Sequence, residues 1–140
     1  MVGLIALLGV SCLRPTQAVM EDTSPLGWAD TVVLTVENGD TTTLRDLSLV
    51  VRSNREFRCD SLPLEITLLT PDFRHYSEQV TFPMRHERSA AALRRVDEIP
   101  YRRRVILNRI GTYRLILFPS IPVEGIEAVG INIVKTEPTE

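Results

Sequence analysis

Lysine, cysteine and long apolar segments are scarce in this chain of 140 residues. Lys135 is the only lysine beside 15 arginines, and the formal charge of −2 gives no general attraction to nucleic acid. The two cysteines, Cys12 and Cys59, cannot form a disulfide framework if Cys12 is lipidated. The apolar segment at residues 2–10 is less than half as long as the roughly 20 residues of a membrane-spanning helix. We therefore expect one small domain without a spanning helix or a nucleic-acid partner.

The apolar segment ends in Ser11-Cys12 and is followed by polar chain that contains Pro15, an order typical of a bacterial lipoprotein leader. Cleavage before Cys12 and acylation of its thiol would anchor the protein to a membrane of the cell envelope, facing the periplasm or the cell surface. Two alternatives stay open. A secretory leader cut after Ala18 would leave a soluble periplasmic protein, and a cytoplasmic protein would use the same segment as a short buried strand or helix.

The lipoprotein interpretation divides the chain into four parts. Residues 1–11 would be the signal peptide, and residues 12–27 the lipid anchor, on Cys12, with its linker. Residues 28–134 would form the folded domain, and residues 135–140 an acidic, frayed tail.

After Met20, apolar and polar residues alternate in short stretches between turn-forming residues, which indicates half-buried antiparallel strands. Asn38-Gly39-Asp40 predicts a tight reversal, because Asn and Gly tolerate a positive φ. Residues 85–98 predict an irregular crossover with a short helical turn at residues 89–93. We expect an all-β fold: a single antiparallel β-sandwich of about seven strands with immunoglobulin-like architecture. Six of the strands would turn these residues inward, and the seventh would lie within residues 99–107: Val32, Leu34, Val36; Leu47, Leu49, Val51; Leu64, Ile66, Leu68; Val80, Phe82, Met84; Tyr113, Leu115, Leu117; Val129, Ile131, Ile133.

Residues that could carry out catalysis are few. His75 and His86 have no Cys, Asp or Glu partner at the spacing of a zinc site. Ser77, His75 and Asp72 could be assembled into a triad, but nothing around them resembles a nucleophile elbow. The glycines are not grouped as in a phosphate-binding loop, and Cys59 is expected to be an unreactive thiol. We therefore expect no enzyme activity, no cofactor and no metal site.

An arginine-rich segment allows two interpretations. It could be a basic patch for anionic lipid, polysaccharide or an acidic partner. We favour a solvated strand face, because acidic residues lie among the arginines and alternation places Arg103 opposite Arg102 and Arg104. Trp28 and Tyr101 could likewise stack on a sugar, although an apolar anchor packed at the sandwich edge is more common. The arginines are Arg85, Arg88, Arg94, Arg95, Arg102, Arg103, Arg104 and Arg109.

Several segments carry a family resemblance through their order along the chain. Gly27-Trp28 precedes a strand that opens with Thr31-Val-Val-Leu, and residues 47–54 (LSLVVRSN) and 64–72 (LEITLLTPD) follow. Gly111-Thr112-Tyr113 then opens one strand, whose Tyr in sandwich domains often closes a corner by hydrogen bonding to nearby backbone. Residues 125–133 (GIEAVGINI) form the last strand. Behind a leader cysteine, this order resembles the gliding-motility lipoprotein H family of Bacteroidetes (GldH).

The resemblance implies a lipid-anchored accessory or scaffold protein of the envelope machinery behind gliding and associated protein secretion, acting by protein–protein binding. Such a sandwich could add a partner strand along an open sheet edge or present a loop-and-edge surface to a membrane complex. The alternative function is a polysaccharide-binding module of a surface glycan system, using aromatics such as Trp28, Tyr76 or Tyr101. A third is a periplasmic enzyme or enzyme inhibitor.

Overall fold

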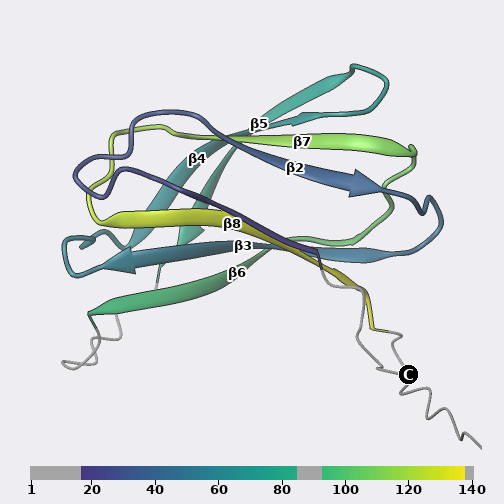
Figure 1. Cartoon of the computed structure of the whole chain (residues 1–140). Coiled ribbons are helices and arrows are strands. Elements are labelled where there is room, and N and C mark those ends of the chain that lie inside the picture. Colours follow the sequence, from purple (N-terminus) through teal and green to yellow (C-terminus); the bar gives the residue numbers. More distant parts are fainter. Residues whose placement is uncertain (1–16, 85–92, 138–140) are drawn as a thin grey trace, which may run out of the picture.

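The chain folds into β-strands throughout the part that the computed structural model describes, residues 17–84 and 93–137 (Figure 1). No helix in this part is long and apolar enough to cross a membrane. The strands are β1 (Gln17–Asp22), β2 (Val32–Asn38), β3 (Arg45–Asn54), β4 (Ser61–Leu69), β5 (His75–Pro83), β6 (Arg94–Val105), β7 (Gly111–Pro119) and β8 (Ile126–Lys135).

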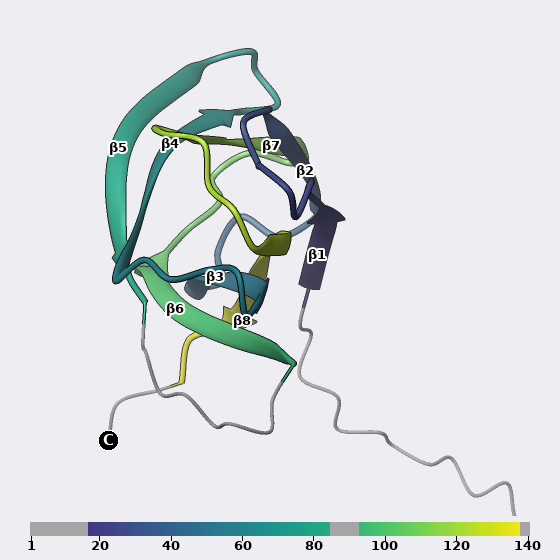
Figure 2. The ribbon, with the colours of Figure 1, turned by 90° about the vertical axis from the view of Figure 1, so that its left-hand side faces the viewer.

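The strands form two four-stranded antiparallel sheets, one in the order β1-β8-β3-β6 and the other in the order β2-β7-β4-β5. The two sheets pack face to face (Figure 2), which confirms the predicted all-β antiparallel sandwich. The number of strands is eight rather than seven. Only β4 and β5 are neighbours both in sequence and in a sheet, so contacts between distant segments hold the fold together.

Alternation of inward and outward residues builds the core, most strictly in β2. In β2, Val32, Leu34 and Val36 are buried while the residues between them are exposed, as predicted. The other predicted inward residues also face the core, fully buried or partly buried against it. Full burial of one such side chain is worth about 1.5–3 kcal/mol. Both sheets contribute: Leu34, Leu64, Phe82 and Leu117 come from one, and Leu49, Val51, Val129 and Ile131 from the other.

Strand β1 corrects the predicted linker at residues 12–27. It pairs with β8 from Gln17 opposite Ile133 to Asp22 opposite Ala128. Only Val19 packs against the core, and the rest of the strand is polar or exposed. One inward apolar residue is too short a pattern to indicate a strand, so the sequence did not reveal β1.

The Asn38-Gly39-Asp40 segment is not the tight reversal that the sequence predicted. Strands β2 and β3 belong to different sheets, so this segment carries the chain across the sandwich. The described residues with positive φ are Phe73, Arg104, Gly111 and Gly125, not Gly39. Asn38 is instead fixed by side-chain hydrogen bonds, described below.

Two further boundaries differ from the prediction. Strand β6 begins at Arg94, so residues 94–98 are not an irregular crossover. The inner face of this part of the strand carries the ion pair Arg95–Asp97 in place of apolar residues, so the sequence shows no alternation of apolar and polar residues there. Most of the predicted helical turn at residues 89–93 lies outside the described residues. The tail prediction is wrong for Lys135, which ends β8, and for Thr136, which donates its N–H to the Leu44 carbonyl at 2.9 Å.

Glycine 130 sets how closely β1 approaches β8. A Cβ there would stand 2.3 Å from the Val19 carbonyl oxygen and 2.5 Å from Met20 Cγ. We predict that Gly130→Ala displaces β1 and lowers the free energy of unfolding by about 1–3 kcal/mol. Chemical denaturation gives the loss, and hydrogen exchange at Val19 should accelerate more than exchange in β7. Gly39→Ala is the control, because nothing lies within 4 Å of its Cβ position; equal effects of both substitutions would contradict the prediction.

Candidate functional site

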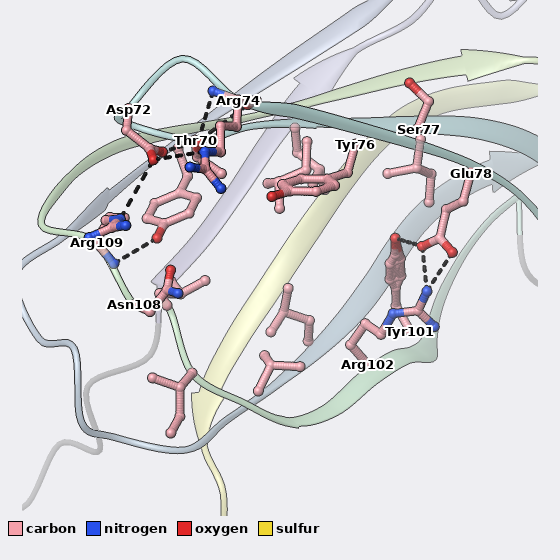
Figure 3. A pocket seen from close by; sticks show the side chains of 18 residues that line it. Thr70, Asp72, Arg74, Tyr76, Ser77, Glu78, Tyr101, Arg102, Asn108 and Arg109 are labelled. Carbon is pink, nitrogen blue, oxygen red and sulfur yellow. Dashed lines mark hydrogen bonds and ion pairs between the residues drawn. The ribbon is translucent and has the colours of Figure 1, made fainter.

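The edge strands of the two sheets are joined differently on the two sides of the sandwich. On one side β1 lies against β2, and Gln17 Nε2 donates to the Glu37 carbonyl at 3.0 Å. On the other side the edge strands β5 and β6 meet around Glu78. Its carboxylate accepts hydrogen bonds from the Tyr101 hydroxyl and from Arg102 Nη2 at 2.6 Å (Figure 3). We call Glu78, Tyr101 and Arg102 the Glu78 cluster.

Packing strengthens the Glu78 cluster on the β6 side. The Tyr101 ring lies 5.9 Å from the buried ring of Phe82, and the Arg102 guanidinium stands 4.9 Å from the centre of the Tyr101 ring. Burial, together with the hydrogen bond to Glu78, raises the pKa of Tyr101 well above its ordinary value of 10.0. Tyr101 therefore stays a neutral hydrogen-bond donor to a carboxylate at physiological pH.

A cleft of about 510 Å³ opens between the Glu78 cluster and the tip of the β4–β5 hairpin. Its floor is apolar and comes from both sheets, and Tyr76 projects into it from β5 (Figure 3). The volume lies within the usual range of ligand-binding clefts. The apolar floor includes Leu47, Ile66, Leu68, Leu107 and Leu115.

The hairpin tip supplies a charged rim for this cleft. Asp72 accepts a hydrogen bond from the Thr70 hydroxyl and lies 3.4 Å from Arg74 Nε and 3.6 Å from Arg109 Nε. The Thr70 hydrogen bond is the largest cause that lowers the pKa of Asp72, and a backbone hydrogen bond and the guanidiniums of Arg109 and Arg74 lower it further. Arg109 belongs to the β6–β7 loop, so this contact joins the two walls of the cleft.

Asn38 holds the β6–β7 loop, residues 106–110, in place. Its buried amide Nδ2 donates to the carbonyls of Leu107 at 2.9 Å and Arg109 at 2.7 Å, and its Oδ1 accepts from Arg45 Nη1 at 2.7 Å. The Tyr113 hydroxyl accepts the Arg109 N–H at 3.0 Å, which confirms the backbone bond expected of a tyrosine corner. The loop is thus fixed by side chains of β2 and β7, neighbours in one sheet, and Arg45 of β3 in the other sheet holds the Asn38 amide in turn.

The residues considered for catalysis do not assemble into a triad. The Ser77 hydroxyl lies 2.8 Å from that of Thr67, and Asp72 is held by Thr70 and two arginines. Cys59 is exposed with a free thiol. Cys12 and His86 lie outside the described residues. In the described part of the chain, no three His, Cys, Asp or Glu side chains gather as a metal site requires.

Four of the six described arginines in the arginine-rich segment pair with acidic residues, but only Asp97 is one of the carboxylates that lie among them in the sequence. Its described ion pairs are Arg94–Glu127, Arg95–Asp97, Arg102–Glu78 and Arg109–Asp72. The predicted alternation around Arg103 is interrupted, because the β3–β6 register shifts near Leu47 and Arg104 has a positive φ; Arg102, Arg103 and Arg104 are all exposed. Arg85 and Arg88 are not among the described residues.

Of the three aromatics proposed to stack on a sugar, Trp28 is excluded by its burial. It packs in the core, and its indole Nε1 donates to the Asp30 carbonyl at 2.7 Å. Tyr101 is half-buried and engaged with Glu78, whereas Tyr76 is exposed at the cleft.

Sequence reasoning did not identify the cleft or the roles of Asn38 and Glu78. Asn38 gave a signal, but next to Gly39 it was interpreted as a turn residue. Glu78 gave none, because its partners Tyr101 and Arg102 lie more than 20 residues away.

Comparison with protein-family models finds none that matches this chain, and no curated protein matches it significantly. The geometry of the cleft and the leader sequence therefore carry the functional argument.

Asn38 is only 4% exposed and all its hydrogen-bonding capacity is used. We predict that Asn38→Ala lowers the free energy of unfolding by about 2–4 kcal/mol, because two carbonyls lose their donor. Asn132→Ala is the matched control. The Asn132 amide makes one exposed hydrogen bond, to the Glu98 carboxylate, so this substitution should lower the free energy of unfolding by less than about 1 kcal/mol. Urea denaturation of both variants checks this; similar losses would contradict the assigned role of Asn38.

Tyr101 and Glu78 should be coupled across the sheets. In a double-mutant cycle of Tyr101→Phe and Glu78→Gln, we expect a coupling energy of about 0.5–1 kcal/mol. Folding raises the pKa of this phenol. Its contribution to stability is therefore complete at pH values below the pKa in the unfolded chain, and it is lost as the pH rises from that pKa through the higher pKa of the folded chain. Wild-type stability should therefore fall relative to Tyr101→Phe above about pH 10. Parallel pH curves and zero coupling would show that the two side chains act independently.

Proposed function

We propose that this protein is a non-enzymatic binding module of the bacterial cell envelope, anchored to a membrane by lipid on Cys12. Its cleft takes an extended segment of a partner protein. The observation that carries the proposal is the cleft itself, where an apolar floor from both sheets is open to solvent between the Glu78 cluster and the Asp72 rim. An apolar cleft with a few placed polar groups is the usual form of a binding site.

The edge strands favour β5 as the place where a partner segment adds. Strand β6 contains seven charged residues and Pro100, which protect an edge from strand addition. Between His75 and Phe82, strand β5 contains one Asp or Glu and no Arg or Lys. A segment along β5 would gain main-chain hydrogen bonds and place alternate side chains in the cleft.

The position of β1 supports anchoring at Cys12 over release by a secretory leader. A cut after Ala18 would remove Gln17 and Ala18, which pair with Ile133 and Asn132. A cut before Cys12 leaves β1 whole. The resemblance to gliding-motility lipoproteins points to the same anchor and to partners in the envelope.

The burial of Trp28 weighs against the polysaccharide-binding alternative. That residue cannot stack on a sugar from inside the core. The exposed Tyr76 remains the aromatic that a glycan could use, so the test below includes a glycan as an outcome.

Photocrosslinking in the native membrane tests the proposal. A photoreactive amino acid replaces Tyr76 in the cleft or, as the control, Val33, which is exposed on the outer face of β2 in the same sheet. We expect a discrete protein adduct from position 76 and none from position 33. Leu68→Glu, which places a charge on the cleft floor, should abolish the adduct in a chain that still folds.

The same preparations test the anchor. The mature chain should begin at Cys12 with added acyl mass, and Cys12→Ser should move it from the membrane to the soluble fraction. An unacylated soluble wild-type chain would refute anchoring. Equal adducts from both positions would refute the cleft, and an adduct whose added mass is removed by glycosidases would replace the protein partner with a glycan.

A further inference from the structure

One end of the sandwich, which we call the tether end, gathers the start of β1, the β4–β5 hairpin tip and the β6–β7 loop. The register places Gln17 opposite Ile133, and Arg45 opposite both Lys135 and Val105. Asn38 pairs with Gly111, whose Cβ position would stand 2.9 Å from Pro71 at the hairpin tip. Figure 1 shows these segments and the C-terminal strand at the same end of the molecule.

The tether end cannot move far from a membrane that holds Cys12. Five residue steps separate Cys12 from Gln17, and a fully extended chain spans at most about 3.3–3.6 Å per residue, or roughly 17 Å in all. This span is a maximum, about two Debye lengths at physiological ionic strength, and a tether that is not fully stretched lets this end come within one Debye length of the lipid or touch it. Charges and apolar side chains at this end therefore act within reach of the lipid headgroups.

Three large apolar side chains are exposed at the tether end. Phe73 at the hairpin tip is 93% exposed, and Ile106 and Ile110 in the β6–β7 loop are 47% and 64% exposed. Pro71 and Gly111 place the hairpin tip beside the loop. These side chains contribute little to the core of this domain, and exposed apolar residues that gather at one place indicate an interaction surface.

The backbone adds an independent observation. The two described non-glycine residues with positive φ, Phe73 at 64° and Arg104 at 55°, both lie at this end. A left-handed conformation is unfavourable for an aromatic or long side chain, and Gly or Asn would suit it better. The fold alone does not explain an exposed phenylalanine at such a position.

Charge distinguishes the tether end from the opposite half of the molecule, where Leu26, Leu93, Val96 and Ile121 are also exposed. When the described chain is divided across the middle of its strands, the tether half carries eight Arg and Lys against six Asp and Glu. The other half carries five against ten. An anionic surface would therefore attract the tether half and repel the other. The tether half consists of residues 17–19, 35–48, 67–78, 100–115 and 131–137.

We propose that the tether end lies on an anionic lipid surface, with Phe73 and Ile110 at headgroup depth and Arg74, Arg104 and Arg109 near the phosphates. This rests on the lipid anchor at Cys12. Aromatic and aliphatic side chains flanked by basic residues are the usual means by which a protein surface lies in a membrane interface. The domain then stands on the membrane with its acidic end outward.

The test uses the full acylated chain in phosphatidylethanolamine–phosphatidylglycerol vesicles. In a Cys59→Ser background, Phe73→Cys or Ile110→Cys carries an environment-sensitive fluorophore, while the acylated Cys12 does not react. Leu26→Cys, at a site 89% exposed on the opposite end, is the matched control. We expect a blue shift and quenching by brominated lipids at positions 73 and 110, none at 26, and a loss of the shift in phosphatidylcholine vesicles.

The outcomes separate this inference from the anchor. A chain that floats with the vesicles but gives the same solvent-exposed emission at 73 and 26 would overturn lipid contact and leave the anchor intact. A chain that lacks acyl mass and does not float would refute the anchor itself. Shielding of position 73 in native membranes but not in pure lipid would assign this end to a protein partner and overturn the proposal. Phe73→Asn, which suits the backbone there, should keep the fold and abolish shielding of a label at 110.

Discussion

The amide of Asn38 fixes the geometry on which the functional surfaces depend. It stands where β2 leaves one sheet and the chain crosses to β3 in the other, and it donates to two carbonyls of the β6–β7 loop. That loop forms one wall of the cleft and carries Ile106 and Ile110. A buried amide with every hydrogen bond made is rigid and specific, because any other arrangement would leave polar groups unpaired. The cleft and the tether end therefore share one support.

The two sheets leave the cleft on the side of β5 and β6 because the edge strands on the two sides of the sandwich are joined differently. Strand β1 lies along β2 and closes its side of the sandwich. Strands β5 and β6 are connected at Glu78, and beyond that point the hairpin tip and the β6–β7 loop diverge around the apolar floor. Tyr101 and Arg102 both donate hydrogen bonds to Glu78, so its carboxylate has its hydrogen-bond partners while the cleft beside it stays open. An open but ordered cleft can bind a partner segment without first unfolding an edge.

The sequence predicted what depends on local periodicity and missed what depends on contacts between distant residues. Alternation at Val32, Leu34 and Val36 was sufficient to predict β2, because one buried face imposes a period of two. Strand β1 was missed because Val19 alone packs inward, and the start of β6 because Arg95 and Asp97 occupy its inner face.

The site itself was even less visible, since the partners of Glu78 and the two loop carbonyls that Asn38 binds lie 23 to 71 residues away. No periodic signal encodes such pairs. The predicted hydrogen bond of Tyr113 is the exception, because its partner Arg109 lies four residues upstream and the Gly-Thr-Tyr sequence is a local signal.

The tether and the cleft together restrict which partners the domain can meet. An anchor at Cys12 would confine the domain to a thin layer above the membrane and raise its effective concentration near other membrane components. A low affinity of the cleft for its partner would then be enough for stable association. If the positive half of the molecule faces the lipid, the cleft, whose rim includes Asp72 and Arg109, lies close to the headgroups. A segment that reaches it must run near the membrane surface. With the anchor and the cleft acting as we propose, the fold would select for the juxtamembrane parts of envelope proteins, through the direction of its charge asymmetry as much as through the shape of the cleft.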